Sequence, residues 1–396
     1  MITREQALEH ITNVRQITGA EELPLHQCLG RTLANDVRAR LTHPPAAMSA
    51  MDGYAVKFTS SLRGETLRLV GEAAAGAPYE GSVGPGECIR VFTGSVVPGG
   101  ADHVVVQEDV LRTEQSVLIQ AEQARPRNIR SAGIDFHEGD VLLPACTRLS
   151  ASHLSICAAA NHPSLTVRRR PTVGLLTNGD ELRPPGAPLT PGQIISSNEY
   201  ALTALIDKWG GNVINLGTAS DDPADIRNRV ETADGLDVFV PIGGASVGDH
   251  DHMKGVFAEL EFEQVFSKVA IKPGKPTWLS KRGNQVVLGL PGNPASALVC
   301  AHLFLRPLLQ SMLGHTADRA WTTGRLTQGI SANGPREAFL RGEAEASADG
   351  TTSITPASDQ DSSLLRPFIK ANILIHRPPN APALNIGDLV DGVRLD

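Results

Sequence analysis

The sequence predicts a multidomain protein of α/β plus β class, with a central domain built on a doubly wound, mostly parallel sheet. Two observations lead to this prediction. Between residues 171 and 313, short apolar runs alternate with helical patterns, as in parallel sheets with right-handed crossovers. Around this region, short β-type runs separated by Gly and Pro turns fill residues 40–140 and return after residue 320.

Length and composition limit the class of protein. With 396 residues the chain is too long for one ordinary core, and 41% hydrophobic with 20% charged residues is typical of a water-soluble globular protein. No apolar stretch reaches the roughly 18–20 residues of a membrane helix, and no secretory pattern opens the chain. The five cysteines are widely spread and form no Cys-x-x-Cys pair, so we expect a reducing cytoplasm. The net charge of −7 argues against nucleic-acid binding.

The first elements are a helix and a set of short strands. Residues 4–18 place apolar side chains on one face of a helix, and Thr3 with Gln6 resembles a capping box. A helical pattern returns around Leu154–Ala160. The β-type runs between these helices are Leu67–Val70, Cys88–Phe92, His103–Gln107 and Val117–Ile119.

The α/β region follows. Its predicted strands are Val173–Leu176, Val213–Leu216, Val238–Ile242, a run near Val265–Ile271, and Val286–Leu290. Helices are expected near Asn198, with Ser196 and Glu199 as a capping box, and after Asp222-Pro223, with Asp as N-cap and Pro at N1. Two more helices are expected near residues 252–260 and from Pro294.

The C-terminal region returns to short strands, which indicates a second small β domain. The predicted strands are Thr323–Leu326, Glu337–Leu340, Ser353–Thr355, Ile373–Ile375 and Leu389–Val393.

Glycine-rich loops follow three strands of the α/β region. They are Thr177–Glu181, Gly243–Asp249 and Pro291–Pro294. If the strands are parallel, the three loops emerge at one edge of the sheet, where open α/β sheets bind ligands. Glycines let backbone N–H groups approach phosphate oxygens, and the nearby carboxylates favour a phosphate bridged by a divalent cation. These carboxylates belong to Asp180, Glu181, Asp249 and Asp251.

Each motif also has a simpler interpretation. Asn293-Pro294 can open a helix whose N-terminus binds an anion, or can be an ordinary helix cap. The loop at Gly243 can be a phosphate or pterin cradle, or a flexible turn. Lys272 and Lys275, on a Pro-Gly turn, can bind an oxyanion or can simply be exposed. Asp52, followed by glycine, is usually a turn residue.

The run 249–252 alternates Asp and His, which suits a transition metal such as zinc. Four adjacent residues cannot all point inward, so a carboxylate of Asp249 or Asp251 facing a hard cation is the simpler arrangement. Mg²⁺ prefers a few carboxylates with phosphate and water oxygens.

Taken together, these segments resemble the molybdopterin molybdenumtransferases of the MoeA family, which includes the E domain of gephyrin. The matching segments occur in the family's order along the chain. They are Ser49–Val56, Arg90–Gly94, Asn178–Leu182, Gly243–Asp249, Ile271–Pro276 and Leu290–Ser296.

The resemblance implies an elongated homodimer with four domains in each chain. These would be a discontinuous helical domain (residues 1–39 and 141–169), a β domain (40–140), the α/β molybdopterin-binding domain (170–316) and a C-terminal β barrel (320–396). The implied reaction inserts molybdenum from molybdate into adenylylated molybdopterin and releases AMP, with Mg²⁺ as cofactor. Implied protein partners are a molybdopterin adenylyltransferase and recipient molybdoenzymes.

The resemblance also implies roles for individual residues. Catalytic roles fall on Asp52, Thr93, Asp135, Glu181, Asp221, Lys268 and Lys272. Cofactor-binding roles fall on Asn178, Gly179, Gly243, Gly244, Ser246, Gly248, Lys275, Pro291, Gly292, Asn293 and Ser362. Metal-binding roles fall on Asp180, Glu181, Asp249 and Asp251. Asp52 and Thr93 would cover the α/β cleft of the other subunit.

The chain departs from the family pattern at several positions. Asn178 replaces a hydroxyl residue and is expected to donate to phosphate instead, and Ile242 replaces a serine. Arg366-Pro367 weakens the match around Ser362. Two other functions stay open, namely molybdopterin adenylylation on the same α/β fold and a non-catalytic scaffold that binds finished cofactor.

Overall fold

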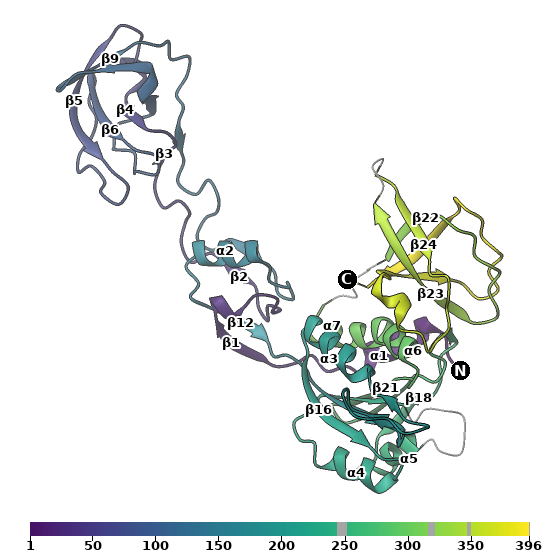
Figure 1. Ribbon diagram of the computed structural model, residues 1–396. Helices are drawn as coiled ribbons and strands as arrows, with labels where there is room; N and C mark the ends of the chain where they lie inside the picture. Colours follow the sequence, from purple (N-terminus) through teal and green to yellow (C-terminus); the bar gives the residue numbers. More distant parts are fainter. Residues whose placement is uncertain (244–251, 316–320, 347–349, 396) are drawn as a thin grey trace. The chain divides into compact units, whose positions relative to one another are not determined.

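The computed structural model describes residues 1–243, 252–315, 321–346 and 350–395 (Figure 1). The chain forms two compact units. One contains residues 1–21 and 168–396, and the other contains residues 22–167.

The first unit is built on a six-stranded sheet with the order β16-β13-β17-β21-β20-β18. The first four strands of this order are parallel, and β20 and β18 are antiparallel to their neighbours. The strands are β13 (Thr172–Asn178), β16 (Asn212–Ala219), β17 (Val238–Ile242), β18 (Glu263–Phe266), β20 (Trp278–Arg282) and β21 (Gln285–Gly289). The mostly parallel sheet confirms the prediction from the alternating pattern.

Helices cover both faces of this sheet (Figure 1). One face packs its alternate side chains, such as Leu175 and Val240, against α1, α3, α6 and α7. The other face packs Leu176 and Phe239 against α4 and α5. Because both faces are buried at the centre of the sheet, β13, β17 and β21 are mostly apolar runs. The helices are α1 (Arg4–Val14), α3 (Asn198–Lys208), α4 (Pro223–Glu231), α5 (His252–Glu259), α6 (Pro294–Cys300) and α7 (Arg306–Met312), with a π-helical turn, η4 (Ala301–Leu305), between the last two.

Some predicted caps are confirmed and one is wrong. Thr3 and Gln6 form the expected capping box, and Asp222 caps α4 through the N–H of Ala224. The capping box of Ser196 and Glu199 does not form, because α3 has Ser197 at its N-cap without a side-chain bond. Ser196 is buried instead, and its N–H donates to the Arg183 carbonyl.

Two predicted elements have different limits. The helix expected over residues 4–18 ends at Val14, because the chain becomes extended and the Thr18 N–H donates to the Met312 carbonyl. The run near Val265–Ile271 is not one strand. It divides into β18 and a short strand, β19 (Ile271–Lys272), which pairs with the C-terminal region rather than with the central sheet. Strand β20 was not predicted.

The C-terminal region of the first unit forms a closed barrel. Its five strands pair in the cycle β23-β24-β22-β26-β25, and β25 returns to β23. Closure leaves no unpaired edge. The strands are β22 (Trp321–Leu326), β23 (Glu337–Ala346), β24 (Thr352–Pro356), β25 (Ile373–Arg377) and β26 (Leu389–Arg394). Each of the five predicted β runs lies within one of them.

The second unit is mainly a six-stranded β sheet with the order β7-β4-β6-β5-β9-β8. Its strands are β4 (Gly53–Val56), β5 (Thr66–Ala73), β6 (Glu87–Val91), β7 (His103–Val106), β8 (Val110–Arg112) and β9 (Ser116–Ile119). A separate small core gathers Cys28, Leu33, Cys157 and Val167 around the helix α2 (Ala151–Ala159). Six short strands form three two-stranded sheets. These are β1 (Ala20–Pro24) with β12 (Ser164–Arg168), β2 (Val37–Arg38) with β11 (Val141–Leu143), and β3 (Met48–Ser49) with β10 (Ile129–Arg130).

The described helices are all too short or too polar to cross a bilayer.

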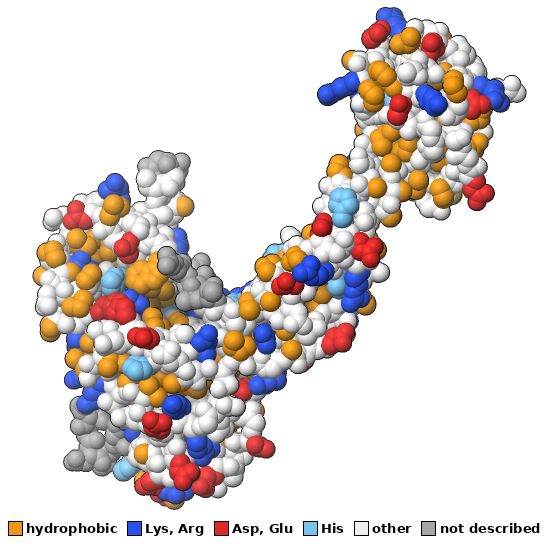
Figure 2. Space-filling model, turned by 180° about the vertical axis from the view of Figure 1, so that it is seen from behind, with side chains coloured by type: hydrophobic (Ala, Val, Ile, Leu, Met, Phe, Trp, Pro, Cys, Tyr) orange, Lys and Arg blue, Asp and Glu red, His pale blue; other side chains and the backbone are white. Residues whose placement is uncertain are grey.

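Lys and Arg side chains are interspersed with Asp and Glu over the face shown in Figure 2. This mixture follows from the composition, in which 36 basic residues are set against 43 acidic ones.

Candidate active site

Three loop ends meet at the carboxyl edge of the parallel strands. A methyl group placed on Gly243 would lie 3.0 Å from the Asn178 carbonyl oxygen, and one placed on Gly292 would lie 3.3 Å from the Gly243 Cα. Gly243 also has a φ of +90°, which favours glycine. Gly243 is therefore favoured as glycine by its backbone conformation, and glycine at 292 lets the ends of β17 and β21 approach closely.

A cavity of about 550 Å³ opens beside this junction. Its lining includes six of the predicted site residues, namely Asn178, Glu181, Gly243, Pro291, Gly292 and Asn293. Leu182, Pro276 and Ser296, which end motif segments of the sequence, also line it, as does Ile242 directly before the Gly243 loop. The lining that the sequence did not indicate is formed by Ile194, Ile195, Ser196, Ser197, Asn198 and Ser363.

The segment 194–198 is the largest part that sequence reasoning missed. Ser197 and Asn198 line the cavity at the start of α3, and the Asn198 Nδ2 donates to the Gly292 carbonyl at 2.8 Å. Because no side chain caps α3, its first N–H groups and the positive end of its dipole remain suited to an anion. The sequence did show a helix start here, but not that it lies against Gly292.

The side-chain amide of Asn178 bonds to backbone carbonyls of the protein itself. Its side chain is buried, and its Nδ2 donates to the Ser220 carbonyl at 2.8 Å and to the Ala219 carbonyl at 3.4 Å. Both amide hydrogens are therefore engaged. The expectation that this amide group donates to phosphate is wrong, because the neighbouring loop at residues 219–220 takes it.

Three predicted carboxylates lie on adjoining loops. Asp180, Glu181 and Asp221 are all exposed, and the Asp221 N–H donates to Asp180 Oδ1 at 3.3 Å. Of the three, Glu181 lines the cavity. Its carboxylate lies back over Gly179, where an added methyl group would come within 2.3 Å of Oε2. Glycine at 179 thus leaves room for the acidic side chain.

The described residues contain no ready-made cluster of three or more metal-ligating side chains. Asp180 and Glu181 nevertheless offer hard oxygen ligands on adjacent positions, which suits Mg²⁺ when phosphate and water supply its other ligands. The remaining loop predictions, Gly244, Ser246, Gly248, Asp249 and Asp251, lie outside the described residues.

The three predicted lysines lie before, in and after the short strand β19. Lys272 and Lys275 are exposed, and Lys268 is partly exposed, while Pro276 carries the Pro-Gly turn after β19 to the cavity wall. The turn is fixed from below, because Thr277 Oγ1 donates to the Gly274 carbonyl at 2.8 Å. A methyl group on Gly274 would meet the buried Cys300 sulfur at 2.2 Å, so the turn packs directly on α6.

A loop of the C-terminal barrel reaches the start of α6. The Ala295 N–H donates to the Ser362 carbonyl at 3.0 Å, and the Asn293 Nδ2 donates to Ser362 Oγ at 3.1 Å. Asn293 is the N-cap residue of α6 and Pro294 follows at the start of the helix, as expected, but the Asn293 side chain makes no capping bond to a helix N–H. The next residue of the loop, Ser363, lines the cavity.

The other predicted acidic residues belong to the unit of residues 22–167. Asp52 Oδ1 accepts the Thr93 N–H at 2.8 Å and the Thr93 hydroxyl at 2.9 Å. Both bonds lower the pKa of Asp52 below its ordinary value, and the bond from the Thr93 N–H has the larger effect. Asp135 is exposed on a turn, and its own backbone N–H donates to the His43 carbonyl.

Family models match almost the whole chain. Residues 2–161 match the MoeA N-terminal region (domain I and II), residues 174–311 match a "Probable molybdopterin binding domain", and residues 323–395 match the MoeA C-terminal region (domain IV).

Individual relatives agree with the family models. The chain is 34% identical to a molybdopterin molybdenumtransferase of Nostoc over 79% of this chain and 74% of the relative. It is 32% identical to the Haemophilus influenzae protein of that name, over 95% of this chain and 94% of the relative. The crystal structure of a molybdopterin biosynthesis MoeA protein from Pyrococcus horikoshii matches with a TM-score of 0.86 and 30% identity, over 100% of this chain and 99% of that one. The chain therefore belongs to the MoeA family of molybdopterin molybdenumtransferases.

Proposed function

We propose that this protein is an enzyme that inserts molybdenum from molybdate into adenylylated molybdopterin and releases AMP. Family membership supports the insertion of molybdenum, because relatives over most of the chain are named for this transfer. The observation that carries the proposal is the cavity of about 550 Å³ where two glycine-bearing strand ends, Glu181 and a barrel loop come together. A phosphorylated pterin fits a site of this size and chemistry.

Each part of the cavity lining has a separate binding role in this proposal. Close backbone approach at Gly243 and Gly292 leaves room for phosphate oxygens beside loop N–H groups, and the start of α3 adds further donors. The apolar Ile194, Ile195 and Ile242 exclude water from the bound pterin. Gly179, Pro291 and Asn293 shape the loops around it. Gly244, Ser246 and Gly248 complete the cradle.

Charge is divided between the acidic loops and the basic turn. Asp180 and Glu181, with Asp249 and Asp251, would hold Mg²⁺, and the bound cation would stabilise the negative charge that develops as the pyrophosphate is cleaved. Lys268, Lys272 and Lys275 attract the molybdate dianion by their charge. The dithiolene sulfurs that receive molybdenum belong to the substrate, so the protein orients them and supplies no ligand of its own.

The remaining proposals concern assembly. The protein acts as a homodimer of four-domain chains in the cytoplasm, and Asp52, Thr93 and Asp135 of one chain complete the cleft of the other. Asp221 and Ser362 contribute at the rim. A molybdopterin adenylyltransferase supplies the substrate and molybdoenzymes receive the product. The bond of Asp52 to Thr93 keeps a charged oxygen at a fixed position, which suits a role of Asp52 in an active site.

Purified protein with preformed adenylylated molybdopterin and molybdate tests the reaction. We expect release of AMP and formation of the molybdenum-containing cofactor. Adenylylation of molybdopterin with ATP, without AMP release in the first assay, would identify an adenylyltransferase instead. Binding of finished cofactor without either activity would identify a scaffold protein.

Glu181→Ala tests the site itself. We expect AMP release to fall by about 10²–10³-fold, which is typical of losing one charged group that stabilises the transition state, while the affinity for molybdopterin stays within a few-fold. Glu9→Ala, which removes an exposed carboxylate on α1, is the matched control and should leave turnover unchanged. Equal turnover in the wild type and Glu181→Ala would contradict the assignment of Glu181.

A further inference from the structure

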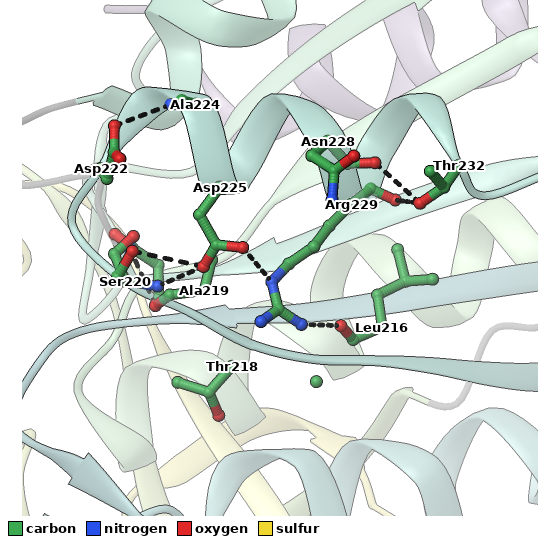
Figure 3. A network of polar contacts seen from close by, with 12 residues as sticks. Leu216, Thr218, Ala219, Ser220, Asp222, Ala224, Asp225, Asn228, Arg229 and Thr232 are labelled. Carbon is green, nitrogen blue, oxygen red and sulfur yellow. Dashed lines mark hydrogen bonds and ion pairs between the residues drawn. The ribbon is translucent and has the colours of Figure 1, made fainter.

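A polar network joins α4 to the loop at residues 219–221 (Figure 3). At its centre, Asp225 Oδ2 accepts the Ser220 N–H at 2.9 Å and the Ser220 hydroxyl at 3.2 Å. In Figure 3 the Asp225 carboxylate lies between Ser220 and the guanidinium of Arg229. Arg229 Nε donates to the other carboxylate oxygen, Oδ1, at 2.9 Å. Both oxygens of Asp225 are therefore engaged by protein groups.

Arg229 ties this network to a bulge in the edge strand of the sheet. Strand β16 carries one extra residue between Asn215 and Thr218, where its register with β13 shifts. The Arg229 Nη1 donates to the Leu216 carbonyl in this bulge at 2.8 Å. Bulges of this kind leave a backbone group outside the ladder and redirect the end of the strand. Arg229 thus fixes both the bulge and the carboxylate of Asp225.

The loop held by Asp225 in turn holds the acidic loop of the candidate site. The Ser220 carbonyl accepts the Asn178 amide at 2.8 Å, and the Gly179 N–H donates to the Ala219 carbonyl at 3.3 Å. The Asp221 N–H donates to Asp180 Oδ1 at 3.3 Å. Three successive residues of the 219–221 loop therefore contact three successive residues, 178–180, directly before Glu181.

We propose that Asp225, held by Arg229, is a positioning residue that sets the place of the Asp180 and Glu181 carboxylates through the 219–221 loop. This inference rests on the proposed function of the cavity. Neither Asp225 nor Arg229 lines that cavity. Both side chains are about one-third exposed, and they point from α4 toward the 219–221 loop and β16 (Figure 3). The pair acts on the reaction through Ser220 and Asn178 and does not touch the substrate.

Two substitutions at Asp225 test separately its bonds to Ser220 and its charge, which pairs with Arg229. Asp225→Ala removes both bonds to Ser220 and leaves the 219–221 loop without its anchor. Asp225→Asn keeps one oxygen that can accept the Ser220 N–H, but loses the charge that pairs with Arg229. We expect kcat for AMP release to fall about 10-fold in Asp225→Ala and about 3-fold in Asp225→Asn, since misplaced catalytic groups lose rate steeply. The affinity for molybdopterin, measured without molybdate, should stay within about 3-fold because the cavity walls remain.

Hydrogen exchange measures the positioning directly, without any activity. We expect faster exchange at the backbone N–H groups of residues 178–183 and 219–222 in Asp225→Ala, and a smaller increase in Asp225→Asn. The double variant Asp225→Ala/Arg229→Ala should turn over no faster than Asp225→Ala. Recovery of activity in the double variant would mean that the unpaired Arg229 charge, rather than the lost anchor, causes the defect, and would overturn the proposal.

Glu259→Ala is the matched control. It removes another Arg–carboxylate pair, between Arg227 of α4 and Glu259 of α5, for which no bond to the 219–221 loop is found among the described residues. We expect wild-type kcat and wild-type exchange at residues 178–183. Unchanged exchange at these residues in Asp225→Ala would also overturn the proposal. If the wild type releases no AMP, the proposed function fails, and the exchange experiment still decides whether Asp225 positions the acidic loop.

Discussion

Asp52, in the unit of residues 22–167, and Asp225, in the α/β domain, use the same hydrogen-bonding arrangement. In each case one carboxylate oxygen accepts both the backbone N–H and the hydroxyl of one residue, Thr93 for Asp52 and Ser220 for Asp225. These bonds lower the pKa of both aspartates. The difference is in the second oxygen. Asp225 gives it to Arg229, whereas no hydrogen bond to Asp52 Oδ2 is found among the described residues.

The comparison shows how one motif can support two roles. A carboxylate whose oxygens are both used by the protein can hold a loop, but it has little capacity left for a ligand. A carboxylate that is fixed through one oxygen presents the other at a defined position and with full charge. This is the arrangement expected of a group that touches a substrate or its cation. We therefore expect substitutions at Asp52 to affect turnover, and those around Asp225 to affect order and stability as well.

The largest expected effect is that of Asp52→Ala. Turnover should fall by about 10²-fold or more, since a charged oxygen at the reacting site is lost. The unfolding midpoint should fall only slightly near neutral pH, because the stabilising bonds from Thr93 to Asp52 are lost but Thr93 can bond to water instead. Steady-state AMP release and thermal unfolding check this prediction. A large loss of stability with normal turnover of the folded fraction would give Asp52 the structural role instead.

A smaller effect is expected for Arg229→Ala. The free energy of unfolding should fall by roughly 1 kcal/mol, because the Leu216 carbonyl loses a donor and a partly exposed ion pair is broken. Urea unfolding measures this change. Arg227→Ala on the same helix provides the comparison and should change stability by less, since its pair with Glu259 is more exposed.

The smallest effects concern titration. In Thr93→Val the pKa of Asp52 should rise only part of the way to its ordinary value of 3.8, because the larger cause of its low pKa, the Thr93 N–H bond, remains. In Arg229→Ala the pKa of Asp225 should likewise rise in part, because the bond from the Ser220 N–H, its largest cause, remains. Carboxyl ¹³C NMR titration measures both values.

The sign of the stability change follows from these shifts. An aspartate whose pKa is lower in the folded state stabilises the fold above its unfolded pKa, and this contribution is lost as the pH falls through the folded pKa. Each variant should therefore be less stable than the wild type near neutral pH, and the part of this difference that comes from the aspartate should vanish in strong acid. In Arg229→Ala the loss of the bond to the Leu216 carbonyl remains at every pH. A difference that grows in acid would contradict the assignment of these bonds.

Sequence patterns predicted the elements whose limits depend on local physics. Apolar runs such as Val238–Ile242 mark strands buried on both faces, and Asp222-Pro223 marks a helix start that satisfies its own N–H groups. They did not predict the end of α1 at Val14 or the bond of Asn293 to Ser362. Both depend on partners far along the chain, Met312 in the first case and the barrel in the second.

The sequence by itself determined that parallel strands ending in glycine would bring Asn178, Gly243 and Gly292 to one edge, because parallel topology places all carboxyl ends together. Only the tertiary structure decided which side chains remain available there. The Asn178 amide is taken by the 219–220 loop, residues 194–198 form a wall of the cavity, and Asp225 is saturated by Ser220 and Arg229. The physical reason is that a polar group bonds to whatever partner folding brings within reach. The Ser220 carbonyl lies 42 residues from Asn178 in sequence, whereas Ser220 and Arg229 lie only five and four residues from Asp225.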